Sequence, residues 1–194
     1  DAAGNESPSI SVTVPAGGGP GGDLPPDPSE VATPIDPTVP TDIFATTAFI
    51  YEGENPIQMD VAPGTIEAKR VAILRGKALD FNGEPVSGIK ITLLNHPEYG
   101  WTLTREDGMF DMAVNGGGQL IVSYEKEGYL PVQRHLETPW RDYMWAEDVI
   151  MTQFDPAMTQ IDLQSPLPMH VAQGSPVTDR SEEHTSELQS RQSI

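Results

Sequence analysis

The sequence contains no cysteine, which excludes both a disulfide framework and a thiolate metal site. It is also poor in basic residues, with 11 Lys and Arg against 29 Asp and Glu and a formal net charge of -18. A chain this acidic repels phosphate backbones and anionic lipids, so we expect neither nucleic acid binding nor membrane insertion. No apolar run is long enough to span a bilayer, and we predict no membrane anchor within these residues.

The common catalytic motifs are absent as well. The sequence has no GxSxG nucleophile elbow and no HExxH zinc motif. Glu106 and Asp107 are adjacent, so on a strand their carboxylates would point to opposite faces and could not share a proton transfer. His96, His135 and His170 fall in separate predicted elements without a paired ligand. We therefore predict no catalytic residue, no metal site and no cofactor, and a protein that is not an enzyme.

Two short acidic clusters could supply oxygen ligands to calcium. One contains Asp80 and Asn82 with Glu84, and the other contains Glu106 with Asp107. Neither offers the six to eight converging oxygens that calcium takes. Asp and Asn also favour turns for local hydrogen-bonding reasons, which is the interpretation we prefer. The predicted structural turn residues are Asp80, Asn82, Gly83, Asp107 and Gly108.

Proline and glycine are abundant, with 19 Pro and 18 Gly among 194 residues, and only 37% of the chain is hydrophobic. Residues 1–47 contain most of the Pro-Gly stretches and no Lys or Arg, so we predict a disordered acidic linker there. Within it, Ser9 to Val14 alternates like a strand, either as a β-prone patch or as the end of an upstream domain. A second linker is predicted over residues 164–179. Because the chain begins at Asp1 instead of Met, we expect a fragment.

Residues 71–153 show the period-two alternation of half-buried strands. The first predicted strand, Val71 to Leu79, places Val71, Ile73 and Arg75 on one face. Asn82-Gly83 predicts a hairpin that joins it to a strand beginning at Ile89.

Further strands are predicted around residues 101–104, 110–114, 119–125, 130–135 and 146–151, with a turn at 105–108. No segment has a convincing helical period. The fold class predicted is all-β, an antiparallel Greek-key sandwich of about seven strands with disordered tails.

Several strings are specific enough to indicate a family. GKALDFNGEPVSGIKI, TREDGMF and EKEGYL resemble the carboxypeptidase regulatory-like domain, a transthyretin-like, Ig-like sandwich of about seven strands. HPEYGWTLTREDGMFDMAVNGG, TPW and DVIM are similar to the transthyretin-related domain of teneurins and bacterial RHS or YD-repeat proteins. The resemblance implies a transthyretin-like domain over residues 48–163, without catalytic metal ligands. The residues that carry the first match are Gly76, Asp80, Gly83, Pro85, Gly88, Thr104, Asp107, Gly108, Phe110, Gly128 and Tyr129.

The last residues differ from the rest. RSEEHTSELQS, from Arg180 to Ser190, resembles the translation of a sequencing-library adapter and no protein family. We expect residues 180–194 to be a non-native tail.

The aromatic residues suggest how the domain could bind. Exposed Trp and Tyr can pack against another domain or stack on sugar rings, whereas Trp101 is expected in the core. The interface candidates are Tyr99, Trp140, Tyr143 and Trp145.

The resemblance implies a non-catalytic spacer module of a large exported bacterial RHS or YD-repeat protein, secreted or on the cell surface. Its expected partners are neighbouring domains of the same polypeptide. The alternatives are a carbohydrate-binding or adhesion module, which would contact a cell-surface glycan or protein, and an accessory domain of an exported enzyme.

Overall fold

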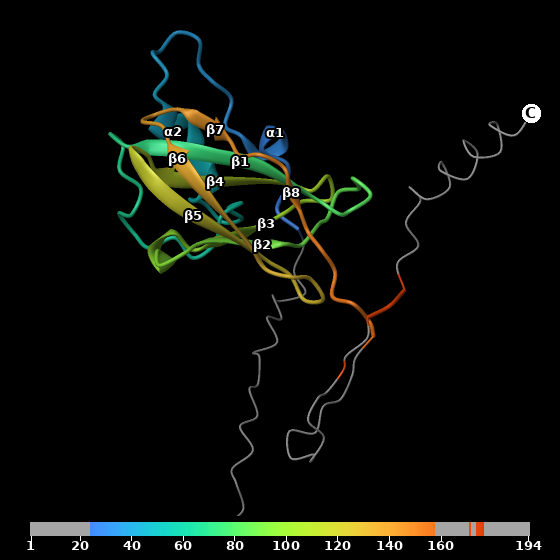
Figure 1. Cartoon of the computed structure of the whole chain (residues 1–194). Coiled ribbons are helices and arrows are strands. Elements are labelled where there is room, and N and C mark those ends of the chain that lie inside the picture. Colours follow the sequence, from blue (N-terminus) through green and yellow to red (C-terminus); the bar gives the residue numbers. More distant parts are fainter. Residues whose placement is uncertain (1–23, 158–170, 172–173, 177–194) are drawn as a thin grey trace, which may run out of the picture. The chain divides into compact units, whose positions relative to one another are not determined.

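The computed structural model describes residues 24–157, 171 and 174–176. Its first compact unit ends at Gln153 and contains two β-sheets that face each other (Figure 1). None of the helices in the described ranges is long and apolar enough to cross a bilayer. The two facing sheets form a β-sandwich, which confirms the predicted all-β fold class.

Each sheet contains four strands. The β1 sheet has the order β4-β1-β7, with β8 also paired to β1, and the β2 sheet has the order β3-β2-β5-β6. The β1 sheet is built from β1 (Val71–Leu79), β4 (Met109–Asn115), β7 (Tyr143–Trp145) and β8 (Val149–Ile150). The β2 sheet is built from β2 (Lys90–Leu93), β3 (Trp101–Leu103), β5 (Gly118–Glu125) and β6 (Val132–Thr138).

The strand pairing is antiparallel throughout the β2 sheet and between β1 and β4. At the other edge of β1 the pairing is parallel, with Ile73 beside Tyr143 and Ala78 beside Val149. The chain reaches this edge by crossing over from β6 in the opposite sheet. Because no hairpin in the described chain connects β7 or β8 to β1, both strands can run parallel to it. The single strand expected around residues 146–151 is thus replaced by two short strands that pair with β1 in turn.

The predicted hairpin between Val71–Leu79 and the strand beginning at Ile89 is wrong. A turn does form, because the Asp80 N–H donates to the Glu84 carbonyl at 2.7 Å. After this turn, however, β2 pairs with β3 and β5 in the other sheet. Turn chemistry sets only the local reversal, whereas burial of Ile89 and Ile91 between the sheets decides which sheet the next strand joins.

The core lies between the sheets. Phe110 of β4 meets Tyr124 of β5 edge to face, with ring centroids 5.7 Å apart, and both side chains are fully buried. The expectation that Trp101 is a core residue is wrong, because Thr102 points inward in its place. The Thr102 hydroxyl can be buried because it donates to the Ile57 carbonyl at 2.8 Å.

Residues 24–50, called here the N-terminal cover, contain the helical turns α1 (Pro28–Val31), α2 (Ile43–Thr47) and η1 (Ala48–Ile50). Asp27 and Asp42 cap the first two, accepting from the N–H groups of Ser29 at 2.7 Å and Phe44 at 2.8 Å. In Figure 1, α2 lies beside β1, which it contacts, and η1 contacts β4. These turns have three to five residues each, too few to show a helical period, which is why the sequence carries no helical signal here.

The cover also changes the interpretation of the predicted linker at residues 1–47. Within the described residues 24–47, Pro25, Pro28 and Thr47 are buried, and Ile43 and Phe44 pack against the core. The sequence disfavours packing here because Pro and Gly are frequent, but a few apolar side chains suffice to hold a short segment on a sheet.

Several predictions concern residues that the structure does not describe. The strand-like patch Ser9 to Val14, most of the linker at 164–179 and the whole tail at 180–194 lie outside the described residues. In the second compact unit, which begins at Phe154, Asp155 accepts hydrogen bonds from the backbone N–H groups of Ala157 and Ser175.

Candidate functional site

The turn that follows β1 is organised by Asp80. Its Oδ1 accepts from the Asn82 N–H at 2.8 Å and the Glu84 N–H at 2.9 Å, and Gly83 has a φ of 83°. The hydrogen bond from Glu84 is the main reason that the pKa of Asp80 lies below its usual value, and the bonds from Asn82 contribute to this shift. These contacts give Asp80 a full set of local donors, as expected of a turn residue.

The turn that precedes β4 packs against the first one. The Asp107 Oδ1 accepts from the Met109 N–H at 2.9 Å, and Gly108 has a φ of 77°. A Cβ on Gly108 would lie 2.5 Å from the Ala78 carbonyl oxygen and 3.0 Å from the Pro85 Cβ. Both the backbone angle and the close approach therefore require glycine at this position.

The described residues offer little that could bind a metal ion. They contain no group of three or more His, Asp or Glu side chains that could hold an ion. His96 bonds instead to Glu98, with Nδ1 and Oε1 2.9 Å apart, and this bond is the main cause of a lowered pKa at Glu98.

Three of the four interface candidates lie on the surface. Trp140 is 61% exposed, Tyr143 52% and Trp145 57%. Tyr99 is wrong as an interface candidate, because it is only 6% exposed and its hydroxyl accepts from the Asn115 N–H at 3.4 Å. The Gln58 Nε2 donates to the Tyr99 carbonyl at 2.7 Å, so the backbone that carries this ring is also held in place.

The three exposed aromatics are called here the β7 surface. Tyr143 and Trp145 are two residues apart on β7, so they share the outer face of the β1 sheet, while Met144 points inward. The Arg75 guanidinium carbon lies 5.9 Å from the centre of the Tyr143 ring, within cation–π range. This face is therefore aromatic and cationic at the same time.

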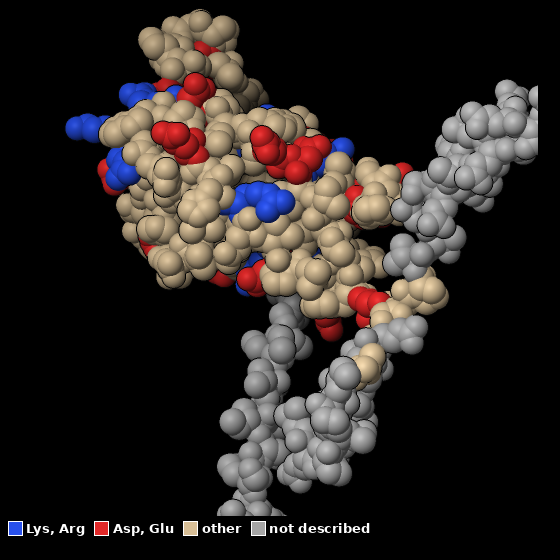
Figure 2. Space-filling view, in the orientation of Figure 1, with Lys and Arg blue, Asp and Glu red and all other residues tan. Residues whose placement is uncertain are grey.

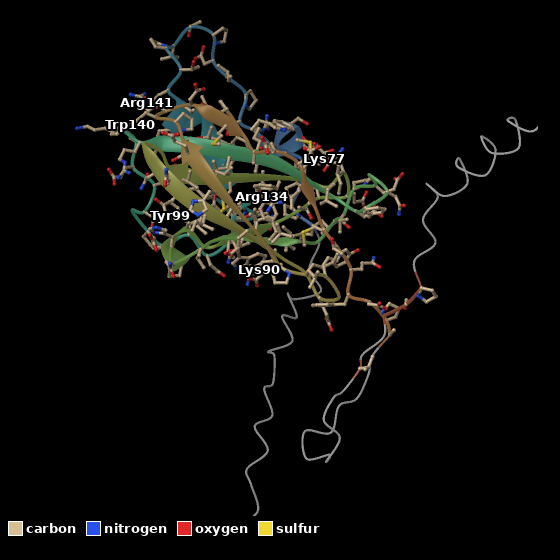
Figure 3. The ribbon with its side chains drawn as sticks, viewed as in Figure 1. Lys77, Lys90, Tyr99, Arg134, Trp140 and Arg141 are labelled. Atoms are coloured by element: carbon tan, nitrogen blue, oxygen red, sulfur yellow. The ribbon has the colours of Figure 1, made fainter. Side chains whose placement is uncertain are left out.

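Trp140 is placed separately, in the connection from β6 to β7. Figure 3 shows it beside Arg141 at that end of the sandwich. Its indole packs on Gly117, where an added Cβ would come within 2.0 Å of Nε1, and the Arg70 guanidinium carbon lies 5.7 Å from its ring centre. Arg141 in turn donates to Asp42 of the N-terminal cover at 2.6 Å.

A buried ion cluster supports the β7 surface from behind. Asp111 has no exposed surface; its carboxylate binds the Arg75 Nε and accepts from the Arg105 Nη1 at 2.8 Å. In the sheet register, Arg75 lies between Asp111 on β4 and Trp145 on β7. The buried carboxylate thus fixes the guanidinium that lies against Tyr143. Asp111 and Arg105 were not identified from the sequence. The signal that could have found them was Arg75, because a charged residue on the same strand face as Val71 and Ile73 needs a buried partner of opposite charge.

The rest of the visible surface carries charges of both signs. Figure 2 shows small groups of acidic and basic side chains separated by large uncharged areas on the face toward the viewer. The negative net charge is therefore not concentrated at one place on this face.

Comparison with solved structures gives only distant likenesses. One is 3-chlorocatechol 1,2-dioxygenase from Rhodococcus opacus 1CP, with 13% identity and a TM-score of 0.36 over 45% of this chain and 62% of that chain. A likeness this weak carries no argument about chemistry.

Curated relatives match more strongly. Teneurin-3 of Danio rerio is 31% identical over 126 residues, which is 63% of this chain and 4% of the relative. Teneurin-1 of Homo sapiens is 32% identical over 87 residues, or 45% of this chain and 3% of the relative. Teneurin-m of Drosophila melanogaster is 28% identical over 116 residues, or 60% and 4%. The chain thus spans about one twenty-fifth of the length of these relatives.

The family comparison locates the match within the sandwich. The model of the family described as the teneurin TTR-like domain matches residues 66–151, from just before β1 to just after β8. This range contains every strand of both sheets in the described residues, and the predicted resemblance is confirmed. Residues 66–151 of this chain are thus similar to the transthyretin-like domain of teneurins.

Proposed function

We propose that this domain is a non-catalytic structural module of a larger exported protein, of the teneurin or bacterial RHS and YD-repeat kind, at the cell surface or secreted. Its β7 surface packs against a neighbouring domain of the same polypeptide. The teneurin match over residues 66–151 and the small share of the relatives that it covers support the first statement.

The exposure of the β7 surface supports the second statement. The outer face of the β1 sheet is buried at Ile73 and Ala113, and the N-terminal cover contacts the strands that carry them. On the same face, Tyr143 and Trp145 are more than half exposed. Clustered Trp, Tyr and Arg side chains are typical of the residues that dominate protein interfaces.

The ion cluster supports a rigid interface in particular. Arg75 is held by Asp111, so little side-chain entropy remains to be lost when a partner covers Tyr143. An enzyme function has no comparable observation behind it: Asp80 and Asp107 bind backbone N–H groups of their own turns, and Asp111 binds two arginines.

A titration against the adjoining domain tests this proposal. The neighbouring domain of the parent protein, produced separately, should bind this chain, and Trp145→Ala should weaken binding by at least about tenfold. Phe81→Ala is the matched control, because Phe81 is 89% exposed on the turn after β1 and lies outside the β7 surface. If the two variants bind equally well, the β7 surface is not the interface.

A further inference from the structure

A groove crosses the outer face of the β2 sheet, on the opposite side of the sandwich from the β7 surface. Its volume is about 420 Å³, and its lining includes Asp60, Thr92, Trp101, Ser123 and Gln133. Of these, Trp101 is half-buried, and Ser123 is 4% exposed at the bottom. The groove therefore has an aromatic wall and a polar floor.

The floor is one straight row across all four strands. Trp101 of β3 lies beside Thr92 of β2, Thr92 beside Ser123 of β5, and Ser123 beside Gln133 of β6. Paired residues in neighbouring strands share a face, so these four side chains project from the same side. The row is roughly 14 Å long, since strands lie about 4.8 Å apart.

Trp101 is held in a fixed position at one end of this row. Its Nε1 donates to the Asp60 Oδ2 at 2.7 Å, and the Lys90 Nζ lies 5.3 Å from its ring centre. An indole fixed by its own nitrogen provides an apolar face without a further ordering cost.

The polar side chains of the row remain available for a ligand. The side-chain hydrogen bonds found among the described residues include none of the Thr92 hydroxyl, the Ser123 hydroxyl or the Gln133 amide, and the one bond to Gln133 from a side chain, Arg134, goes to its backbone carbonyl. Hydroxyls and amides both donate and accept hydrogen bonds. The row thus matches a ligand that carries many groups of the same dual kind.

The charges around the groove disfavour an anionic ligand. Lys90 lies beside Glu125 in the sheet register, so the positive charge in the groove is offset by a negative one. Asp60 adds a second carboxylate, which disfavours phosphate and sulfate groups.

From the row and this charge balance, we propose that the groove binds a neutral oligosaccharide. The C–H face of one sugar packs on Trp101, and its hydroxyls bond to Thr92, Ser123 and Gln133.

An oligosaccharide array and a titration test this proposal on the whole chain. The array carries neutral hexose oligomers, sulfated and sialylated oligomers and unrelated octapeptides, and the neutral sugars should bind. Trp101→Ala should weaken this binding at least about tenfold, and Gln133→Ala, at an exposed edge position, about threefold to tenfold.

Two matched controls separate the groove from other surfaces. Gln119→Ala lies on the same face of β5 outside the groove, and Trp145→Ala removes an exposed indole from the other sheet. Both should leave sugar binding unchanged, and Trp145→Ala should still weaken domain docking. The proposal is overturned if no neutral sugar binds at millimolar concentration, if only charged sugars or peptides bind, or if Gln133→Ala and Gln119→Ala bind alike.

Discussion

The outer faces of the two sheets differ in nearly every respect. The outer face of the β1 sheet buries Ile73, Ala113 and Asp111 beneath the N-terminal cover, and its uncovered part is aromatic and cationic. The outer face of the β2 sheet is lined by hydroxyl and amide groups around Trp101, beside the short 3-10 helix Pro97–Tyr99, which contacts β2. One face is built to be covered by protein, and the other is suited to water or a hydrated ligand.

The largest expected effect comes from the core that both faces share. Phe110→Ala should lower the free energy of unfolding by about 3 to 5 kcal/mol, because a fully buried ring that touches both sheets leaves a cavity. Chemical denaturation of this variant and of Phe81→Ala, whose ring is exposed, measures the difference. Equal midpoints for the two variants would mean that Phe110 does not join the sheets.

The next prediction contrasts a carboxylate from each face. Asp111→Asn should destabilise the domain by about 3 kcal/mol, because two arginines that face a fully buried carboxylate lose their counter-charge. Glu125→Gln on the β2 sheet should cost less than about 0.5 kcal/mol, because Glu125 and its cross-strand neighbour Lys90 are both exposed to water. Urea midpoints of the two variants would contradict the contrast if they shifted equally.

A buried tyrosine, Tyr124, and a partly buried one, Tyr51, predict a loss of stability at alkaline pH. Burial raises the pKa of Tyr51 and of Tyr124 to about 12 from an ordinary value of 10.0. Between pH 10 and 12 the unfolded chain releases these protons and the folded chain keeps them, so stability falls as pH rises. The expected slope is at most about 1.4 kcal/mol per pH unit for each tyrosine.

Removing the Tyr124 hydroxyl isolates one part of this slope. That hydroxyl has no hydrogen-bond partner among the described residues, so Tyr124→Phe should be nearly neutral at pH 7 and should flatten the loss above pH 10. Leu120→Ala on the same strand is the control, because it should destabilise the domain equally at both pH values. An unchanged alkaline slope in Tyr124→Phe would show that Tyr124 does not cause the loss.

Local signals in the sequence were good guides to single strands and turns. The alternation from Val71 to Leu79 matches the bounds of β1, and Phe110, Met112 and Val114 are all buried as an inward row. The turn at Asp107 and Gly108 also lies where a short polar segment with glycine interrupts the alternation. These features depend on neighbours in the chain, which the sequence displays directly.

Sheet membership could not be predicted in the same way. Asn82-Gly83 indicated a reversal but not that β2 would cross to the other sheet, and nothing local to Tyr143 indicates a parallel partner in β1. Both outcomes depend on contacts between residues far apart in sequence.

The candidate site shows the same limit. Tyr99, Trp101 and Trp145 are all large aromatics in strand-like or turn-like sequence, yet only Trp145 is more than half exposed. Their burial depends on the segments that pack on them, including Gln58 and Asp60 from the connection before β1. The N-terminal cover, which decides the burial of the β1 sheet, has too few apolar residues to stand out in the sequence.

Acrylamide quenching of tryptophan fluorescence tests the central claim most directly, namely that the β7 surface is covered by a neighbouring domain. The measurement compares this chain with a longer version that includes that domain, both in a Trp101→Phe background so that only Trp140 and Trp145 report. The account predicts red-shifted, readily quenched emission from the chain alone, and a blue shift with at least about twofold less quenching when the neighbour is present. Emission that is already protected in the chain alone, or quenching that the neighbour leaves unchanged, would contradict it.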